Sequence, residues 1–386
     1  MPIPLPPAAP APLPLAGIRS DLLDCVQVNL AVLADHFHGP GTHLRLGARL
    51  DLPLRTLPDG LPTADPTLDT RLTGDAPLVG LRPVSRRGLP VADLLAETAR
   101  RTDAHYVVAD SYHLPWLPYH GNAHMEHSFL LAAGPTGWHV TDAYRVETRW
   151  GAAEPGEHIL DERELAGIGT AEVVTFAPAP PEPAEPSVAD FDPGPYVTAY
   201  ATWPDRLRAL GQLSAETWLL ARARRLHAAH RAQRAGRAEP PEAVRAHLAV
   251  WDKLVEQTYL AQRRVARGRA EPAGALDRLA ELLAADRTVF AVDRGAFAHD
   301  SDDAAAAADR DELRPSVARA AAGVLGVTEA ELLDGAALDS FPSFSSFRLV
   351  EIIDRIESDL GLELAADELI PEQLRHVDDF CRIARR

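Results

Sequence analysis

The spacing of apolar residues changes along the chain, and each change predicts a different kind of structure. Residues 21–37 carry apolar side chains at helical intervals, and short runs rich in β-forming residues follow, separated by glycine or charged turns. These runs are 105–110, 127–134, 138–144 and 172–176. A helix followed by several strands predicts an α+β domain over residues 18–178.

The middle of the chain has a helical pattern. Apolar residues recur every three or four positions over 214–236, 242–268 and 274–286, and each run ends near glycine or proline. We therefore expect three long helices in an all-α middle region over 196–298. Proline-rich or charged stretches at 179–195 and 299–312 flank it and are typical of linkers.

Residues 313–386 predict a further amphipathic helix. A helix that begins near Ser346 and ends at Gly361 leaves acidic side chains such as Glu351 and Asp354 mostly in water. Its inward positions are Leu349, Ile352, Ile353, Ile356 and Leu360. On periodicity alone, a small bundle with a solvated acidic face is a sufficient interpretation.

Length and composition indicate a multidomain protein without a membrane span. The chain has 386 residues, more than one ordinary core accommodates, and no stretch approaches the length of apolar sequence that a transmembrane helix needs. Residues 1–17 lack a basic start and are rich in proline, which predicts a disordered arm rather than a secretion signal. Two distant cysteines cannot form a disulfide scaffold, which fits a cytoplasmic protein.

The charge is distributed unevenly. The net charge is −17, which excludes a general nucleic-acid binder. Residues 201–300 carry 17 basic and 12 acidic side chains, whereas 311–386 carry 8 basic and 16 acidic ones. We expect these segments to attract each other, with Arg263 and Arg264 on one side and Glu351 and Asp354 on the other.

Three residues of the N-terminal domain could form a thiolate–imidazolium catalyst. Cys25 lies near the start of a predicted helix, where the helix dipole lowers a thiol pKa. His127 opens one strand of a predicted hairpin and Asp142 ends the next, so the hairpin returns the carboxylate to the histidine. The alternative is that Cys25 is a buried, inert residue. Asp21 and Gln27 are polar neighbours of Cys25, but neither is an obvious oxyanion donor.

Other polar and aromatic residues of this domain allow more than one interpretation. His120, His124 and His127 form H-x3-H-x2-H, but the glutamate and helix of the zinc-protease signature are missing, so we expect no metal. Trp116 and Tyr119 either line an acyl or acceptor pocket near the active cleft or belong to the core.

The order of residues in the last segment resembles an acyl or peptidyl carrier protein over nearly all of 311–386. The resemblance implies a four-helix bundle in which Ser346 carries a covalent 4′-phosphopantetheine cofactor. Ser345 stands where the family usually has aspartate. The alternative Ser340 would place Pro342 near the helix start and Gly361 six residues too late.

A second resemblance covers roughly 18–178 and involves the family of butirosin biosynthesis protein H. The matching residues are Asp24-Cys25, Asn29-Leu30, Leu33, Leu46-Gly47, Leu117-Pro118-Tyr119-His120, His127 and Asp142. The family is identified with a papain-like cysteine fold, and its named member moves an acyl group from a carrier protein to an aminoglycoside amine. The resemblance implies that Cys25 is the nucleophile, His127 the base and Asp142 the orienting acid.

Together the two resemblances predict a cysteine-dependent acyltransferase of bacterial secondary metabolism, of the kind used in antibiotic biosynthesis. Its partners would be a phosphopantetheinyl transferase, an acyl- or aminoacyl-loading enzyme and a small-molecule amine or hydroxyl acceptor. A cysteine thioesterase or peptidase that releases the carrier-bound chain is a second enzymatic hypothesis. A non-catalytic scaffold that docks the carrier is a third.

Overall fold

The computed structural model describes residues 13–101, 103–291, 313–361, 364, 369 and 374–384. Most of the expected arm over 1–17 and all of the expected linker over 299–312 lie outside the described residues. Within the described ranges, no helix combines the length and apolar character that crossing a membrane requires. Internal contacts divide the chain into two compact units. The first is Met1–Arg55, Ala64–Ala189 and Arg222–Pro240, and the second is Thr56–Thr63, Asp190–Ala221 and Pro241–Arg386.

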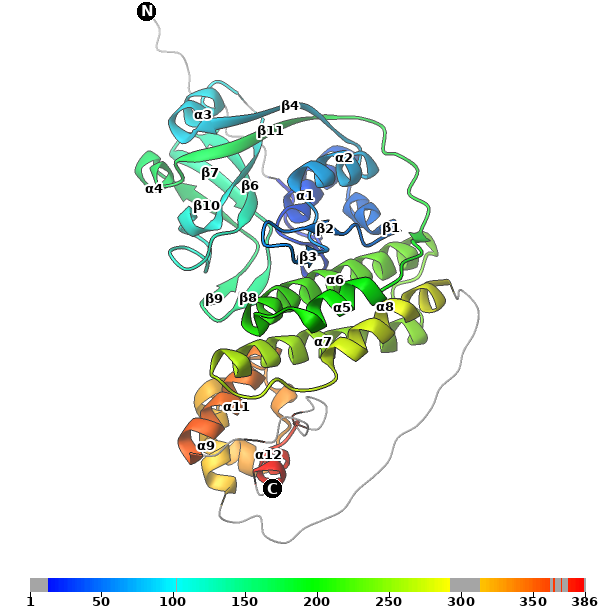
Figure 1. The fold of residues 1–386 in the computed structure, drawn as a ribbon. Helices are drawn as coiled ribbons and strands as arrows, with labels where there is room; N and C mark the ends of the chain where they lie inside the picture. Colours follow the sequence, from blue (N-terminus) through cyan, green and yellow to red (C-terminus); the bar gives the residue numbers. More distant parts are fainter. Residues whose placement is uncertain are drawn as a thin grey trace, which may run out of the picture. The chain divides into compact units, whose positions relative to one another are not determined.

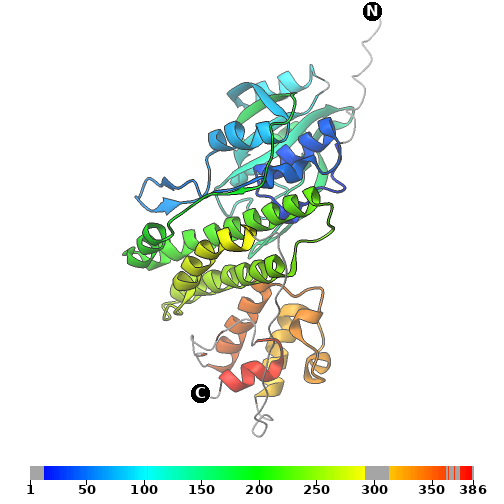
Figure 2. The ribbon, with the colours of Figure 1, turned by 90° about the vertical axis from the view of Figure 1, so that its right-hand side faces the viewer.

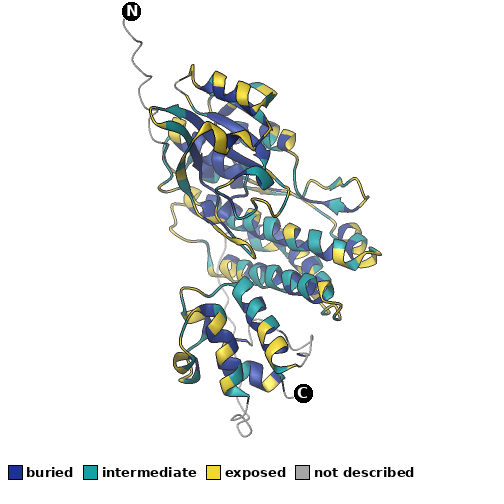
Figure 3. Cartoon of the chain, turned by 90° about the vertical axis from the view of Figure 1, so that its left-hand side faces the viewer, coloured by how far each residue is buried: buried dark blue, intermediate teal, exposed yellow. Residues whose placement is uncertain are grey.

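The first unit is built around a six-stranded sheet (Figure 1). The strand order is β10-β7-β6-β5-β11-β4, and the pairings between them are antiparallel. The strands are β4 (Leu81–Pro90), β5 (His105–Asp110), β6 (Glu126–Gly134), β7 (Gly137–Asp142), β10 (Gly156–Leu160) and β11 (Thr170–Pro178). Buried positions dominate the central β5 and β6, as Figure 3 shows, so the expected β-rich runs form the core of this unit.

Helix α1 (Gln27–His38) is buried along most of its length. Every residue from Gln27 to Asp35 is buried, because α1 lies between other elements and exposes no broad face to water. The other helices of this unit before α6 are α2 (Leu68–Leu78), α3 (Val91–Thr98) and α4 (Glu162–Ala166). Shorter elements of this unit are η1 (Ser20–Leu22), η2 (Thr42–Gly47), η3 (Ser111–His113), β1 (Arg49–Leu50), β8 (Val146–Thr148), β9 (Gly151–Ala153) and β12 (Ser187–Val188). The pair β2 (Arg55–Thr56) and β3 (Pro62–Thr63) belongs to the second unit except for Arg55.

Helix α6 (Arg206–Arg234) contributes its second half to the first unit. A Cβ atom on Gly47 would lie 2.4 Å from the carbonyl oxygen of Leu226, so only glycine allows this approach. The His227 ring bonds the Gly47 carbonyl at 2.7 Å, and the His230 ring bonds the Ala184 carbonyl at 2.9 Å. Part of the expected linker over 179–195 is therefore held against the first unit.

The second unit is mainly helical, and the three expected long helices are present as α6, which spans both units, α7 (Glu242–Ala266) and α8 (Ala275–Ala291). Helices α7 and α8 lie side by side (Figure 2), and α5 (Gly194–Thr202) contacts α8. Tyr196, Trp251 and Phe290 are among the fully buried side chains that fill this core. The long amphipathic helices bury these aromatic residues on their inner faces.

The last segment forms a group of short helices around one core. They are α9 (Arg314–Leu325), α10 (Glu329–Leu333), η4 (Leu338–Ser340), α11 (Ser346–Leu360) and α12 (Val377–Ile383). The inward positions expected on α11 are confirmed for Leu349, Ile352, Ile353 and Ile356, each at most 3% exposed. Cys381 is a buried core residue here. The chain is thus a mixed α/β protein with many helices.

Candidate functional site

The β6–β7 hairpin brings His127 and Asp142 together. Leu130 pairs with Thr141, so Phe129 stands opposite Asp142 one step further on, and His127 lies diagonally across on the same face. The ring nitrogen Nε2 of His127 lies 2.7 Å from Oδ2 of Asp142. His127 is 0% exposed and Asp142 is 3% exposed. The expected approach of the carboxylate to the histidine is confirmed.

Asp142 accepts hydrogen bonds on both carboxylate oxygens. Trp116 Nε1–H donates to Oδ2 at 2.9 Å, and the Tyr144 N–H and the Asn29 side-chain amide donate to Oδ1 at 3.0 and 3.3 Å. Burial by itself would raise the pKa of Asp142, but the contact with His127 and these hydrogen bonds hold it below its usual value. The carboxylate is therefore ionised at neutral pH and can orient the His127 ring.

Cys25 lies two residues before α1 and is tied to β6. Its thiol donates to the carbonyl of Glu126 at 3.4 Å, while the Ser128 hydroxyl donates to the Cys25 carbonyl at 2.6 Å. These contacts fall on the residues immediately before and after His127. The other ring nitrogen of His127, Nδ1, is buried and has no hydrogen-bond partner among the described residues. The half-buried Cys25 is thus bonded to the two residues that flank His127, whose ring retains one unused nitrogen.

The expectation of a lowered thiol pKa is wrong. Burial raises the pKa of Cys25 well above its usual value, and Asp24, Asp65 and Asp142 raise it further, while Arg71 lowers it. The helix dipole does not lower the thiol pKa here, because the Asp24 carboxylate caps the start of α1 and its charge raises that pKa. Its Oδ1 accepts the N–H groups of residues 26 and 27 at 2.9 and 2.8 Å. Cys25 is therefore a neutral thiol that needs a base.

Asn29 and Tyr144, to which we assigned no role from the sequence, contact the histidine–aspartate pair. Asn29 links Ser128 to Asp142, since its amide donates to the Ser128 carbonyl at 2.8 Å and its oxygen accepts the N–H of Ala143 at 3.2 Å. The Tyr144 ring stands edge-on to His127, with 5.0 Å between the ring centroids. Trp116, expected as a pocket wall or a core residue, donates to the carboxylate instead.

Arg222 on α6 holds the segments that flank the site. Its guanidinium donates to the carbonyl of Ser20 at 2.9 Å, to that of Leu23, and to that of Arg145 at 2.8 Å. Ser20 and Leu23 precede Cys25, and Arg145 follows Asp142 and Tyr144. The second half of α6 therefore fixes both chain segments that lead into the site.

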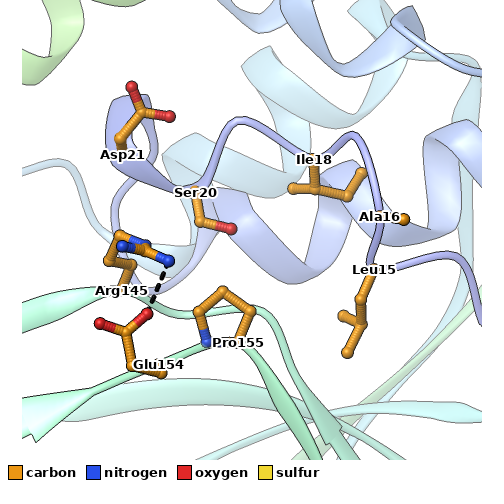
Figure 4. Close-up of a pocket in the computed structure, with 8 residues that line it drawn as sticks. All are labelled: Leu15, Ala16, Ile18, Ser20, Asp21, Arg145, Glu154 and Pro155. Atoms are coloured by element: carbon orange, nitrogen blue, oxygen red, sulfur yellow. Dashed lines mark ion pairs between the residues drawn. The ribbon is translucent and has the colours of Figure 1, made fainter.

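A cavity of about 510 Å³ lies between the same two segments (Figure 4). Its apolar lining comes from Leu15, Ala16, Ile18 and Pro155. Its charged side chains are already paired with one another or with a neighbour: Arg145 pairs with Glu154 at 2.6 Å, and Asp21 pairs with Arg19 at 2.8 Å. The cavity is therefore an amphipathic recess without an uncompensated charge.

The remaining polar candidates lie elsewhere or have other partners. His124 is exposed and bonds Asp110 at 2.6 Å, and His120 is exposed. In the part of the chain that the structure describes, no group of three or more potential ligands could hold a metal ion. One N–H of the Gln27 side chain donates to Asp75 at 3.1 Å. The N–H of Cys25 has no hydrogen-bond partner among the described residues and is available for that role.

The second candidate site is the start of α11. The helix begins at Ser346 and ends before Gly361, which adopts the left-handed conformation with φ 64°, so the expected bounds are confirmed. The Ser345 side chain accepts the N–H of Arg348 at 3.2 Å. Serine therefore performs the capping that aspartate performs equally well. Ser340 ends the three-residue η4 and donates to the carbonyl of Ala337.

The expected attraction between the basic and acidic segments is confirmed in part. Arg263 pairs with Asp354 at 3.1 Å, and Arg264 pairs with Glu357 at 3.2 Å. Glu351, in contrast, pairs with Arg348 on its own helix at 2.9 Å, so its expected role in this contact is wrong. All these residues belong to the second unit.

Comparisons with known proteins give no match: no family model matches the chain, and neither does any curated protein. The resemblances to a butirosin H-like domain and to a carrier protein therefore remain predictions.

Proposed function

We propose that this protein is a cysteine-dependent acyltransferase that takes an acyl or aminoacyl group from a phosphopantetheine thioester on its own carrier segment. The observation that carries the proposal is the state of His127. Its Nε2 is held by the ionised, buried Asp142, Nδ1 has no partner among the described residues, and Cys25 is bonded to the residues on either side of His127. A cysteine ahead of a buried helix, with histidine and carboxylate on an antiparallel sheet, supports the papain-like assignment.

The start of α11 fits a covalent phosphopantetheine on Ser346. No acidic residue lies in the first turn of this 15-residue helix, and the helix dipole favours a phosphodiester there. The group would supply a thiol that carries the acyl chain as a thioester. The four-helix-bundle assignment of the carrier segment belongs to the same proposal.

The proposal assigns the chemical steps to the chain's own residues. The Cys25 thiol gives its proton to Nδ1 of His127 as Sγ attacks the thioester carbonyl carbon. His127 returns the proton to the departing sulfur, which leaves an acyl group on Cys25. An acceptor amine then attacks this carbonyl and gives a proton to His127, which passes it to Sγ as the C–S bond breaks, so that the amide leaves and the neutral thiol is restored. The available Cys25 N–H would stabilise the oxyanion in both steps.

Because the pKa of Cys25 is raised, proton transfer and attack must occur together rather than through a resting thiolate. This requirement gives His127 a larger role than in a site where the thiol is already ionised. The thiolate fraction at neutral pH would otherwise be too small to react.

The decisive experiment uses the full chain carrying a labelled acyl group on the arm, with and without an amine, followed by intact-mass analysis. The proposal expects an acyl group on Cys25 in the parent protein, none in Cys25→Ala, and an amide conjugate only when amine is present. Free acid without a conjugate would identify a thioesterase or peptidase. Absence of acyl-Cys25 with the thioester unconsumed would identify a docking scaffold.

A further inference from the structure

Four arginines crowd the carboxyl end of α7. Arg263, Arg264, Arg267 and Arg269 lie within seven residues of one another. Burial lowers the pKa of Arg267, and the like charges of Arg263 and Arg269 lower it further. Such a cluster is unfavourable unless carboxylates are brought to it.

The carboxylates come from α11. Asp354 pairs with Arg263 and Arg267, and Glu357 pairs with Arg264 and Arg269. Arg264 and Glu357 are only 3% and 2% exposed. Glu357 also accepts the N–H of residue 364 at 2.9 Å, so this buried carboxylate has a backbone donor in addition to its arginine partners. A buried pair of this kind is not the weak, salt-screened attraction expected from net charge alone.

Apolar contacts accompany the ion pairs. Leu260 of α7 belongs to the same hydrophobic core as α9, α11 and α12. The ring of Tyr259 stands edge-on to that of Phe347, with centroids 4.6 Å apart and an angle of 72°. Phe347 directly follows Ser346, so α7 contacts α11 from its second residue to its twelfth.

The carboxylates that α7 binds share a row along α11 with position 346. Positions 346, 350, 354 and 357 are separated by four, four and three residues and therefore form one row along a helix. Asp354 and Glu357 of this row are bound by α7, and Val350 is 3% exposed. Any enzyme that approaches Ser346 along this row meets α7.

We propose that the basic end of α7 is an internal docking surface for α11 that competes with partner proteins for the Ser346 face. This inference rests on the proposed function, because it requires that Ser346 be modified. A phosphopantetheinyl transferase then reaches Ser346 in the fraction of molecules in which α11 has left α7. Loading enzymes that bind Asp354 and Glu357 of α11 would also compete with α7 for these carboxylates.

The test measures the rate at which a promiscuous phosphopantetheinyl transferase and coenzyme A modify the full chain, read by intact mass. Arg263→Glu/Arg267→Glu reverses the charges that hold Asp354 but leaves the buried Arg264–Glu357 pair in place. We expect at least a roughly threefold faster modification in this variant, since the attraction of positions 263 and 267 for Asp354 becomes a repulsion. Adding Asp354→Arg should restore the contact and return the rate toward that of the parent.

Arg355→Gln is the matched control. Arg355 lies on the same helix and pairs with Asp359 at 2.9 Å, yet both residues are exposed and neither bonds α7. This variant should be modified at the parent rate, and Ser346→Ala should not be modified. Circular dichroism confirms that each variant is folded.

The outcomes separate the two proposals. Equal rates for the parent and the Arg263→Glu/Arg267→Glu variant would overturn the docking inference and leave the acyltransferase proposal intact. If no variant gains an arm while a free carrier protein does, the assignment of Ser346 fails, and the inference fails with it. If the Arg263→Glu/Arg267→Glu variant gains an arm and the parent protein does not, the result supports both the assignment of Ser346 and the docking inference.

Discussion

Both ends of α1 lie near a buried histidine–aspartate pair, but only one pair has an unused ring nitrogen. Near the carboxyl end, Nδ1 of His43 bonds Asp35 at 2.8 Å, and Nε2 of the same ring accepts the N–H of Arg19 at 3.2 Å. Near the amino end, Nε2 of His127 bonds Asp142 at 2.7 Å, and Nδ1 has no partner among the described residues. The two rings are 1% and 0% exposed, so burial does not distinguish them.

A buried histidine–aspartate pair does not by itself indicate catalysis. Asp35 also accepts the N–H groups of Gly41 and His43, so the first pair closes the loop that follows α1. All polar atoms of that ring are used, which leaves none to move a proton. His127 keeps one nitrogen and lies beside Cys25, so this pair can act as a base.

The largest expected effect comes from replacing each histidine in turn. His127→Ala should slow acyl-enzyme formation by roughly 10²–10⁴-fold, because a general base is lost next to a neutral thiol. His43→Ala should leave the rate of the folded protein unchanged and lower the free energy of unfolding by about 1–3 kcal/mol, because it leaves the buried Asp35 short of a donor.

Single-turnover transfer of a labelled acyl group gives the rates, and urea denaturation gives the stabilities. A loss of rate in His43→Ala that equals the loss in His127→Ala would show that the unused nitrogen does not decide the function.

The second prediction concerns the carboxylates. Asp142→Asn should slow transfer by roughly 10–10²-fold, less than His127→Ala, because an amide oxygen still accepts from the ring. All four contacts of Asp142 are with donors, however. The NH₂ group of asparagine would therefore face at least one donor with which it cannot form a hydrogen bond. We therefore also expect a loss of about 1–3 kcal/mol in unfolding free energy.

Asp35→Asn is the matched variant, since Asp35 also accepts only from donors. It should lose stability by a similar amount and keep the parent transfer rate. The same two assays apply, and a transfer rate that falls in both variants alike would contradict the comparison.

Local pattern predicted much of the fold and the pairing within the site. The β-rich runs 127–134 and 138–144, with a glycine turn between them, predicted the hairpin, and the strand period then brings Asp142 diagonally to His127. The bounds of α11 followed from its apolar spacing and from Gly361. These features depend on residues close together in the sequence.

Features that depend on distant residues or on competing charges were not predictable. Arg222 reaches Ser20 and Leu23 from a helix about 200 positions later, and nothing in local spacing indicates that contact. The direction of the thiol pKa shift was missed because the helix dipole was considered without Asp24, whose carboxylate takes up the first amides of α1. The signal was present, since Asp24 adjoins Cys25.

The third prediction tests that carboxylate. Asp24→Asn keeps an oxygen to cap α1 but removes the charge that disfavours the thiolate, so the pKa of Cys25 should fall. Removing a nearby unit charge is worth on the order of 1 kcal/mol, so alkylation by iodoacetamide below the thiol pKa should be roughly fivefold faster.

The measurement is the pH profile of Cys25 alkylation, read by peptide mass because Cys381 is a second, buried thiol. Asp21→Asn is the control, since Asp21 lies near Cys25 in sequence and already pairs with Arg19. Identical profiles for the parent and Asp24→Asn would show that burial alone raises the thiol pKa.

The smallest expected effect concerns Trp116. Trp116→Phe removes one donor from Asp142 and keeps an aromatic ring near Phe129, whose centroid lies 5.1 Å from that of Trp116. The pKa of Asp142 rises toward its usual value but stays well below neutral, so at pH 7 the rate constant of transfer should fall only a few-fold. A depressed carboxylate pKa stabilises the fold above the unfolded pKa of about 3.9 and loses that contribution as pH falls through the folded value. The variant should therefore lose stability at pH 7 relative to the parent, and the difference should shrink in acid.

Trp150→Phe is the control, because Trp150 is 37% exposed and does not bond Asp142. Steady-state kinetics of the two variants separate the role of positioning residue from the role of pocket wall. A positioning role for Trp116 predicts that kcat falls while KM for the acyl acceptor is unchanged. If KM rises instead and the acid dependence of unfolding matches that of the parent, Trp116 contacts the substrate directly. The N–H bond to Asp142 would then be incidental to transfer, and Asn29 and Tyr144 would hold the carboxylate without it.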